Sequence, residues 1–279
     1  DRKIAFIGPG VMAEAMIAGL IRRQTAPAAA LIAAGPSQNR LDELCQRYGI
    51  TCLPDNVAAA SQAEVVVLSV KPQRLARVLN GLKGSIQPRA LVLSIVAGAT
   101  LHKISLGLAH DIVVRCMPNT PAQIGEGITV WTASAAVSTD QHEMARQILS
   151  ALGEQVFVEE ENYLDMATAL SGTGPAYVFL FMEAMIDAGV HLGFPRRIAE
   201  QLVTQTMRGS LDFYTQRGGP THLAALRNQV TSPGGTSAEA LYYLEKAGFR
   251  TAISRAIWAA YERSQSLGKE AKGTPPEPA

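Results

Sequence analysis

Small residues near the start of the chain have the spacing of a phosphate-binding turn. The segment Gly8-Pro9-Gly10-Val11-Met12-Ala13 is a GxGxxA motif, and it directly follows the apolar run Ile4–Ile7. In such a motif the first glycine permits a tight turn and the second lets the backbone approach a pyrophosphate. The small last residue lets a helix pack on the strand, and the free N–H groups at the helix start face the phosphates. We therefore predict that Gly8, Pro9, Gly10, Val11 and Met12 bind a dinucleotide.

The segment after the next expected strand, Leu31–Ala34, indicates which dinucleotide is preferred. An NAD site usually has an acidic residue there, which bonds the ribose 2′-hydroxyl. This chain has no acidic residue before Asp42, and Ser37, Asn39 and Arg40 are placed to hold a 2′-phosphate instead. The alternative is that Ser37 or Asn39 only caps the following helix and Arg40 is solvated. We expect NADPH to be preferred, with NADH as the second choice.

The first half of the chain alternates short apolar runs with helical patterns. Leu75, Val78, Leu79 and Leu82, for example, follow the i, i+3, i+4, i+7 spacing of an amphipathic helix. Continuous apolar runs are typical of strands buried on both faces of a parallel sheet. The alternation predicts right-handed βαβ units, and hence a Rossmann-type doubly wound α/β domain with helices on both faces. Its later strands are expected at Val65–Val70, Leu91–Val96 and Ile112–Met117.

The pattern changes near Glu159-Glu160-Glu161, and no convincing strand follows. We expect an all-α second half whose apolar helices, including Phe179-Leu180-Phe181-Met182, bury part of their surface against another subunit. The expected domains are a dinucleotide-binding domain over 1–160, a helical substrate and dimerisation domain over 161–267, and a disordered tail over 268–279. The helices are expected at Tyr163–Leu170, Ala176–Leu192, Arg196–Tyr214, Ala238–Ala247 and Thr251–Leu267.

Composition excludes several other classes of protein. The net charge of +1, from 25 basic and 24 acidic residues, lacks the basic excess of a nucleic-acid binder. We see no run of about 18 apolar residues, so no membrane span is expected. The apolar start is broken by Gly8-Pro9-Gly10, so no signal peptide is expected either. Cys45, Cys52 and Cys116 form no CxxC or Cys/His pattern, which predicts no disulfide framework, no metal site and a cytoplasmic location.

Further motifs lie where the expected parallel strands end. Val70-Lys71-Pro72-Gln73, Val96-Ala97-Gly98 and Arg115-Cys116-Met117-Pro118-Asn119-Thr120-Pro121 each occupy such a position. Doubly wound sheets bind ligands at the carboxyl ends of their strands. We therefore expect these three segments to border the dinucleotide.

Two more motifs lie in the helical half. Leu170-Ser171-Gly172-Thr173-Gly174-Pro175-Ala176-Tyr177 opens it, and Val230-Thr231-Ser232-Pro233-Gly234-Gly235-Thr236-Ser237 lies near its end. The Pro-Gly-Gly turn of the second motif precedes a helix that begins near Thr236, and such a turn can offer N–H groups to a carboxylate. The alternative is a turn that only joins two helices, with Ser232 or Thr236 as the cap.

Taken together, these motifs resemble those of pyrroline-5-carboxylate reductases, and the resemblance extends over residues 2–267. It implies an oxidoreductase that transfers hydride from NAD(P)H to L-1-pyrroline-5-carboxylate and makes L-proline, the last step of proline biosynthesis. It also implies a homodimer formed through the helical domain, or a ring of such dimers. The only expected partners are other copies of the chain and the small cyclic imine carboxylate, with no nucleic acid and no membrane.

The resemblance also implies roles for particular residues. Asn119 and Thr120 approach the nicotinamide ring, Asn56 contacts the adenosine side, and the Ser237 hydroxyl is the catalytic donor to the substrate nitrogen. The residues implied beside the nicotinamide ribose are Ser69, Val70, Lys71, Pro72, Ala97 and Gly98. The implied substrate contacts are Asn119, Ser232, Gly234, Gly235, Thr236 and Ser237. The chain departs from the family pattern at Ser237, where Thr is usual, and at Thr221, Leu223 and Asn228, where Glu, Pro and Asp are common.

Two other functions compete with this interpretation. A β-hydroxyacid dehydrogenase or a general imine reductase shares the layout, but such enzymes typically carry a catalytic Lys or Asp on the long interdomain helix. Here that helix has Glu183 and Asp187 and no Lys. A regulatory protein that binds the cofactor without turnover is the other alternative. The presence of Asn119, Ser237 and the Pro-Gly-Gly turn favours the reductase.

Overall fold

A computed structural model describes residues 2–216 and 221–270 of the chain. Its contacts divide these residues into two compact units. The sheet unit contains residues 2–175 and 259–270, and the helical unit contains residues 176–258. Residues 268–270 of the expected tail belong to the last helix, and residues 271–279 lie outside the described part of the chain.

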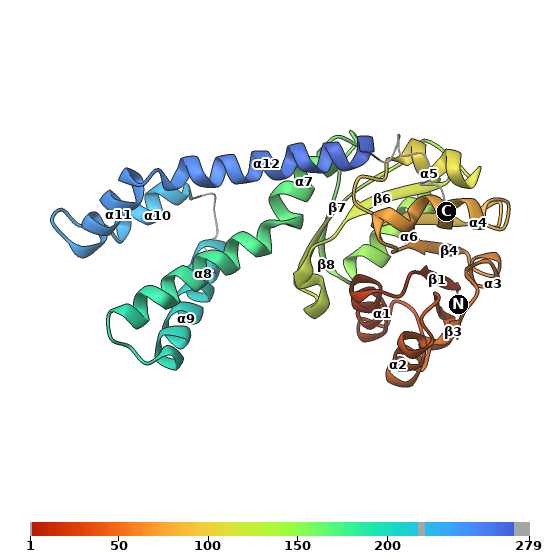
Figure 1. Cartoon of the computed structure of the whole chain (residues 1–279), viewed down its shortest axis with the longest axis horizontal. Helices are drawn as coiled ribbons and strands as arrows, with labels where there is room; N and C mark the ends of the chain where they lie inside the picture. Colours follow the sequence, from red (N-terminus) through yellow and green to blue (C-terminus); the bar gives the residue numbers. More distant parts are fainter. Residues whose placement is uncertain (1, 217–220, 271–279) are drawn as a thin grey trace, which may run out of the picture. The chain divides into compact units, whose positions relative to one another are not determined.

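The sheet unit is built on eight strands in the order β3-β2-β1-β4-β5-β6-β7-β8 (Figure 1). Neighbouring strands pair in parallel, except that β6 and β7 are antiparallel. This confirms the predicted doubly wound sheet and its expected strands. The bounds are β1 Ile4–Ile7, β2 Leu31–Ala34, β3 Thr51–Leu53, β4 Val65–Leu68, β5 Leu91–Ser94, β6 Val113–Met117, β7 Gly127–Ala133 and β8 Gly153–Phe157.

Strands β3, β7 and β8 are absent from the sequence-based expectation. Strand β3 has three residues and lies at one edge of the sheet, while β8 lies at the other edge with exposed residues. Strand β7 alternates buried and half-buried residues over part of its length. None of them has the continuous apolar run of a strand covered on both faces, which is the pattern the sequence analysis relied on.

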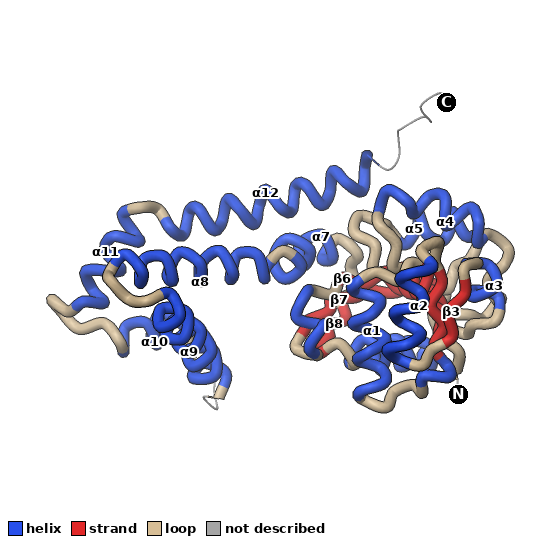
Figure 2. The backbone as a smooth tube through the Cα atoms, turned by 60° about the horizontal axis from the view of Figure 1, so that its bottom comes forward, coloured by secondary structure: helices blue, strands red, loops and turns tan. Residues whose placement is uncertain are grey.

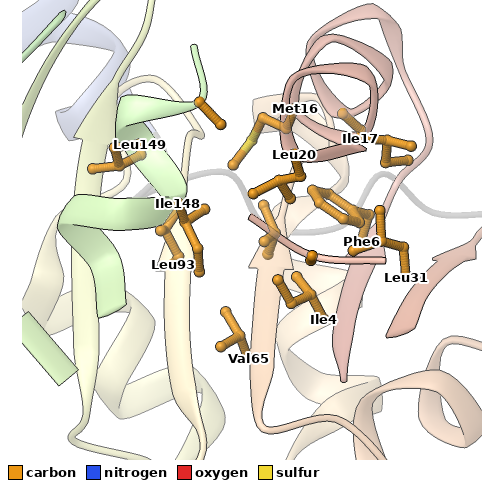
Figure 3. Close-up of a cluster of buried hydrophobic side chains, with 14 of the residues drawn as sticks. Ile4, Phe6, Met16, Ile17, Leu20, Leu31, Val65, Leu93, Ile148 and Leu149 are labelled. Carbon is orange, nitrogen blue, oxygen red and sulfur yellow. The ribbon is translucent and has the colours of Figure 1, made fainter. Parts of the chain in front are cut away.

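Helices cover both faces of the sheet, and each face has its own apolar core. Ile4 and Phe6 of β1 belong to one core, whereas Ala5 and Ile7 belong to the other, as the alternation of a strand requires. The first core, shown in Figure 3, receives Met16, Ile17 and other side chains from the helices on that face. Those helices are α1 Val11–Arg22, α2 Gln38–Tyr48 and α6 Thr139–Ser150. The second face is covered by α3 Asn56–Ser61, α4 Leu75–Leu82 and α5 Leu101–Leu108.

Beyond β8 the described chain is helical, as predicted, and Figure 2 shows these helices in blue. The helix expected at Tyr163–Leu170 is divided into α7 Tyr163–Ala167 and the π-helical turn η4 Thr168–Gly172. One short helix, α10, was not expected, because its seven residues carry little apolar periodicity. The remaining bounds are α8 Gly174–His191, α9 Arg196–Thr215, α10 Leu223–Gln229, α11 Thr236–Lys246 and α12 Phe249–Glu270.

Many large apolar side chains of α8 are exposed, among them Phe179 at 61% and Leu180 at 66%. By length and composition alone, Tyr163–His191 could span a membrane, with a mean hydropathy of 1.2 and 6% of the tested window buried. The sequence analysis expected no membrane span because it saw no run of about 18 apolar residues; the charged residues Glu183 and Asp187 lie within this stretch. Such a surface on a globular protein commonly marks a contact with another molecule.

Candidate active site

The GxGxxA turn has the geometry that its residue types predict. Gly8 has φ +93°, and a Cβ atom there would lie 2.6 Å from Cγ1 of Val70. Gly10 is the N-cap of α1 and makes no side-chain cap bond, and a Cβ there would meet no heavy atom within 4 Å. The first N–H groups of α1 are therefore open to a ligand, and they carry the partial positive charge of a helix N-terminus.

A cavity of about 890 Å³ opens beside this turn. Its size is within the range of roughly 300–1,000 Å³ that is common for small-molecule sites. Four segments of the sheet unit line it: the GxGxxA turn, the start of α2, the start of α3, and the segment from β4 through α4. The charged side chains in the lining are Arg40, Lys71, Arg74 and Arg77, with Asp55 as the acidic one. The cavity is therefore suited to an anion.

About half of the predicted cofactor residues line this cavity. They are Gly8, Pro9, Gly10, Ser37, Arg40, Asn56, Ser69, Val70 and Lys71. The remaining predicted residues lie in the same unit but outside its lining. They are Val11, Met12, Asn39, Pro72, Ala97, Gly98, Asn119 and Thr120.

Asn56 carries a polar atom that the described protein leaves unsatisfied. Its Oδ1 is buried and has no hydrogen-bond partner among the described residues, and the residue lines the cavity. The preceding Asp55 caps α3 by accepting a bond from the N–H of Val57 at 2.8 Å. Leaving a buried acceptor unpaired costs on the order of 1–3 kcal/mol, so such an atom in a cavity wall indicates a ligand that donates to it.

Ser37 and Arg40, expected together at a 2′-phosphate, differ in how they are engaged. Ser37 is the N-cap of α2 but its side chain makes no cap bond, so capping does not occupy its exposed hydroxyl. Arg40 donates from Nε to the Pro9 carbonyl at 3.0 Å, from Nη1 to Glu43 at 2.7 Å and from Nη2 to Glu14. Burial by itself would lower the pKa of Arg40, but the hydrogen bonds to Glu14 and Glu43 outweigh it and raise that pKa. Arg40 is thus paired within the protein and supports the turn.

Ser69 and Lys71 follow β4 at the opposite side of the turn. The Ser69 hydroxyl donates to the Gly8 carbonyl at 2.8 Å and also lies 3.1 Å from the Ile7 carbonyl. This bond fastens the end of β4 to the GxGxxA turn. Lys71 is exposed and, within the described chain, joins no ion pair. Its charge is available to a ligand in the cavity.

The amide of Asn119 is used within the sheet unit. Its Nδ2 donates to the Ser171 carbonyl in the π-helical turn at 3.2 Å, and its Oδ1 accepts from the N–H of Ile128 at 3.0 Å. The sequence analysis assigned this amide to the nicotinamide and the substrate. In the structure it holds the turn after β6 against the π-helical segment. Such π-helical segments are frequent at functional sites.

Sequence reasoning missed three basic residues of the sheet unit. Arg74 and Arg77 line the cavity, and Arg115 is buried in β6 with 2% of its surface exposed. The sequence does carry a signal for the first two. Arg74 and Arg77 are three residues apart, so they lie on the same, polar side of the amphipathic helix that contains Leu75. For Arg115 the signal is a charged residue within an apolar strand, which needs a buried partner.

The Pro-Gly-Gly turn in the helical unit is only partly as expected. Gly234 has φ +72°, and the N–H of Gly235 donates to the Ser232 carbonyl at 3.0 Å, which closes the turn. The Gly235 N–H is therefore engaged, and it is not free to bind a carboxylate as predicted. Gly235 is the N-cap of α11 without a side-chain cap bond, so neither Ser232 nor Thr236 acts as the cap. In the described chain the N–H groups of Gly234 and Thr236 have no partner, and Ser237 is half-buried in the first turn of α11.

Comparisons with known proteins agree with this arrangement along the whole chain. Residues 161–267 match the family model described as pyrroline-5-carboxylate reductase dimerisation, and residues 3–98 match that described as NADP oxidoreductase coenzyme F420-dependent. The pyrroline-5-carboxylate reductase of Synechocystis is 45% identical over 96% of this chain and 99% of its own length. That of Pseudomonas aeruginosa is 40% identical, over 96% and 97% of the two chains. The chain belongs to the pyrroline-5-carboxylate reductase family.

Solved structures of family members have the same fold. The Plasmodium falciparum pyrroline carboxylate reductase with NADP bound superposes with a TM-score of 0.87 at 32% identity, covering 96% of this chain and 98% of its own. The Coxiella burnetii enzyme gives 0.86 at 35% identity, covering 95% and 98%. Prephenate dehydrogenase from A. aeolicus, at 11% identity and a TM-score of 0.54, shows only that its fold is similar. The predicted family and its fold class are thus confirmed, and the rival dehydrogenase class loses its support.

Membership in this family also bears on assembly and on metals. The matched dimerisation model spans the whole helical unit, which suggests a homo-oligomer. The described residues contain no group of three or more His, Cys, Asp or Glu side chains that could hold a metal ion.

Proposed function

We propose that this protein reduces L-1-pyrroline-5-carboxylate to L-proline with NADPH, the final step of proline biosynthesis, and that it acts in the cytoplasm. Near full-length identity to named reductases supports the reaction, and a relative with bound NADP supports the cofactor. The free thiols of Cys45, Cys52 and Cys116 agree with a reducing compartment. The observation that carries the proposal is the cavity itself, where the GxGxxA turn, an uncapped helix start and the unpaired Asn56 oxygen meet.

The residues of the cavity fit the cofactor. When bound, NADPH supplies the hydride that reduces the C=N carbon of the substrate. The N–H groups at the start of α1 would hold the pyrophosphate, and Gly10 would leave room for it. The buried Oδ1 of Asn56, which has no partner among the described residues, would accept a hydrogen bond from the adenosine side of the cofactor. Ser69 keeps the end of β4 against the turn, which places Val70 and Lys71 in the cavity wall.

Other predicted cofactor residues stay proposals. Pro72, Ala97 and Gly98 follow strands β4 and β5, and we assign them to the nicotinamide ribose end. Thr120 is exposed after β6 and is free to approach the ring, whereas Asn119 acts mainly by positioning that segment. The hydrogen bonds of Asn119 explain why an amide suits this position: it donates to one segment and accepts from another.

The turn before α11 suits the carboxylate of the substrate. The N–H groups of Gly234 and Thr236 and the first turn of α11 provide donors beside a positive helix end. The Ser237 hydroxyl lies in the same turn, so it donates to the ring nitrogen of a substrate whose carboxylate is held there. Ser232 and Gly235 shape the turn, because the N–H of Gly235 donates to the Ser232 carbonyl. The substrate thus needs no arginine clamp.

Assembly involves the helical unit. Burying the exposed apolar residues of α8 against another molecule would remove them from water. The residues that match the dimerisation family model include this helix. A second copy of the chain provides a matching apolar surface by two-fold symmetry. We assign the dimer interface to the helical unit, with a ring of dimers as the larger assembly.

The reaction is tested by following NADPH oxidation with L-1-pyrroline-5-carboxylate as substrate. A parallel reaction offers β-hydroxyacids with the oxidised cofactor, which tests the dehydrogenase alternative. We expect turnover with the cyclic imine and none with the hydroxyacids. Turnover with hydroxyacids alone would contradict the proposal, as would cofactor binding without any turnover, which is the behaviour of a regulatory protein.

A further inference from the structure

Two of the three cysteines lie beside each other at one edge of the sheet unit. Cys45 is exposed near the end of α2, and Cys52 is half-buried in the middle of the edge strand β3. The Cys45 thiol donates to the Ile50 carbonyl at 3.3 Å, two residues before Cys52. The Cys52 thiol donates to the Leu41 carbonyl at 3.2 Å, one helical turn before Cys45. Each thiol therefore reaches the segment that carries the other cysteine.

The two thiols are also in contact with each other. A side-chain hydrogen bond joins them, and the short connection through Gly49, which has φ +66°, turns the chain back from α2 into β3. Burial raises the pKa of the Cys52 thiol to about 11, and the neighbouring Cys45 and Asp42 add to this rise. Sulfur atoms in such contact are close enough to form a disulfide with little movement of the backbone.

The third cysteine differs from this pair. Cys116 is fully buried in β6, where its thiol donates to the Ser94 carbonyl at 3.4 Å, and burial raises its pKa strongly. A buried, protonated thiol reacts poorly with oxidants. An oxidant from solution therefore meets the exposed Cys45 first, with Cys52 as the adjacent second thiol.

Both elements that such a bond would join also border the cofactor cavity. Residues 54–57, which directly follow β3, line it, and so do Ser37 and Arg40 at the start of α2. Strand β3 is held by pairing on one side only, over three residues. Shortening the sulfur separation to the roughly 2.05 Å of a disulfide would draw β3 toward α2. Residues 54–57 would move with it, including the buried, unpaired Oδ1 of Asn56.

We propose that Cys45 and Cys52 form a reversible disulfide that lowers the affinity of the neighbouring cavity for its dinucleotide. The effect on the cofactor rests on the proposed function, whereas the disulfide does not. In a reducing cytosol the pair stays reduced, and a hydroperoxide is the oxidant that would change it.

The oxidation balances with one hydrogen peroxide for each pair. The Cys45 thiolate attacks a peroxide oxygen, the O–O bond breaks, and one water leaves while Cys45 becomes a sulfenic acid. The Cys52 sulfur then attacks the Cys45 sulfur, the S–S bond forms and the second water leaves. The two thiols lose two electrons and two protons in all. An added thiol reverses the step by exchange.

The disulfide is tested on the full chain by treating it with hydrogen peroxide, unfolding it and alkylating the remaining thiols. Mass spectrometry without reduction should find Cys45 and Cys52 in one cross-linked peptide pair and Cys116 alkylated, and dithiothreitol should restore all three thiols. Cys116→Ser, the matched control, should form the same cross-link, whereas Cys45→Ser should form none. Oxidation of Cys45 to a sulfinic acid without the cross-link, or a cross-link only between chains, would overturn the proposal.

The effect on the cavity is tested by nicotinamide fluorescence with NADPH and no substrate. Oxidation should raise the Kd of the wild-type chain about threefold or more, since a binding site tolerates only small displacements of its contacting groups. Dithiothreitol should reverse the change, and Cys45→Ser should bind equally before and after peroxide. An unchanged Kd in a chain shown to carry the disulfide would overturn the effect on the cavity. If the reduced wild-type chain binds no NADPH, the proposed function fails instead, and the cross-linking result still decides whether the disulfide forms.

Discussion

Nη1 of Arg115 lies 2.9 Å from Oε1 of Glu161, and around this pair four segments of the sheet unit are joined: β6, residues 161–165, α12 and the start of α5. Nη2 of the same arginine reaches Asp165 of α7 at 3.2 Å, and Asp165 also accepts from the Ser264 hydroxyl of α12 at 2.9 Å. Glu161 accepts from the N–H of Leu101 at 2.8 Å as well. Two parts of the sheet unit are therefore bonded to Arg115 of β6, directly or through Asp165. They are residues 161–165, which precede α8, and the part of α12 that contains Ser264.

Arg115→Met should destabilise the protein markedly. Arg115 is 2% exposed, and its loss would leave two carboxylates without their cation, which costs about 3 kcal/mol when a buried pair is broken. Arg146→Met is the control, because Arg146 and Glu143 are 50% and 48% exposed and such exposed pairs contribute little to stability. Urea unfolding of both variants measures the difference. Equal losses in the two variants would contradict the role given to Arg115.

Glu14 should make the stability depend on pH in the acid range. Burial alone would raise its pKa, but hydrogen bonds from Arg40, Tyr48 and Arg47 outweigh this and lower it from the ordinary 4.5. A carboxyl whose pKa is lower in the folded state stabilises the fold above pH 4.5, and that contribution is lost as the pH falls through the folded-state pKa.

Glu14→Gln should therefore flatten the decline in unfolding free energy below pH 4.5 and lower the stability at neutral pH. Unfolding by urea at a series of pH values measures this. The control is Glu126→Gln, since Glu126 is exposed and has no ion pair in the described chain. If the unfolding free energy of Glu14→Gln fell as steeply with decreasing pH as that of the wild type, groups other than Glu14 would cause the loss of stability in acid.

Gly10→Ala should separate folding from cofactor binding. Gly10 has φ −80°, and a Cβ there meets no heavy atom within 4 Å, so the fold should tolerate the methyl group. The methyl group would occupy the place where a pyrophosphate approaches α1, so the Kd for NADPH should rise about tenfold or more. At Gly8, by contrast, alanine would lie 2.6 Å from Val70, and the protein itself should be destabilised. Cofactor titration and thermal melting of both variants distinguish the two effects.

Ser237→Ala should lower kcat about tenfold or more, the usual scale for losing a positioned donor, while the Kd for NADPH stays constant. Ser237→Thr should keep its activity, because the hydroxyl is retained. If Ser237 only stabilises the start of α11, alanine would cost about 1 kcal/mol of stability and leave kcat unchanged. Measuring kcat, cofactor Kd and melting temperature on the same variant decides between these accounts.

Leu180→Glu should weaken the oligomer. Leu180 of α8 is 66% exposed, and a charge in an apolar interface opposes association. Leu106→Glu is matched to it, since Leu106 is 69% exposed but lies on α5 of the sheet unit. Light scattering should show a smaller mass for Leu180→Glu only. A wild-type chain that is monomeric and active would contradict the proposed interface.

The sequence by itself determined the features that depend on near neighbours along the chain. The glycine spacing of the GxGxxA turn, the apolar runs of β1, β4, β5 and β6, and the helical second half are local patterns set by backbone geometry and burial. These were enough to predict the fold class, and about half of the predicted cofactor residues line the cavity. They did not reveal β7 and β8, because a strand with one open side or edge has a weaker apolar pattern.

Only the tertiary structure decided which polar groups are free to bind a ligand. In the sequence nothing indicates that Arg40 has a partner, yet its guanidinium donates a hydrogen bond to Glu14, 26 residues away. Asn119 is similarly engaged by Ser171, 52 residues away. Arg74 and Arg77, unnoticed in the sequence, remain exposed at the cavity. The physical reason is that a charged group or an amide forms hydrogen bonds with whichever groups folding brings within about 3 Å. The number of residues between two groups in the sequence does not predict whether folding brings them together.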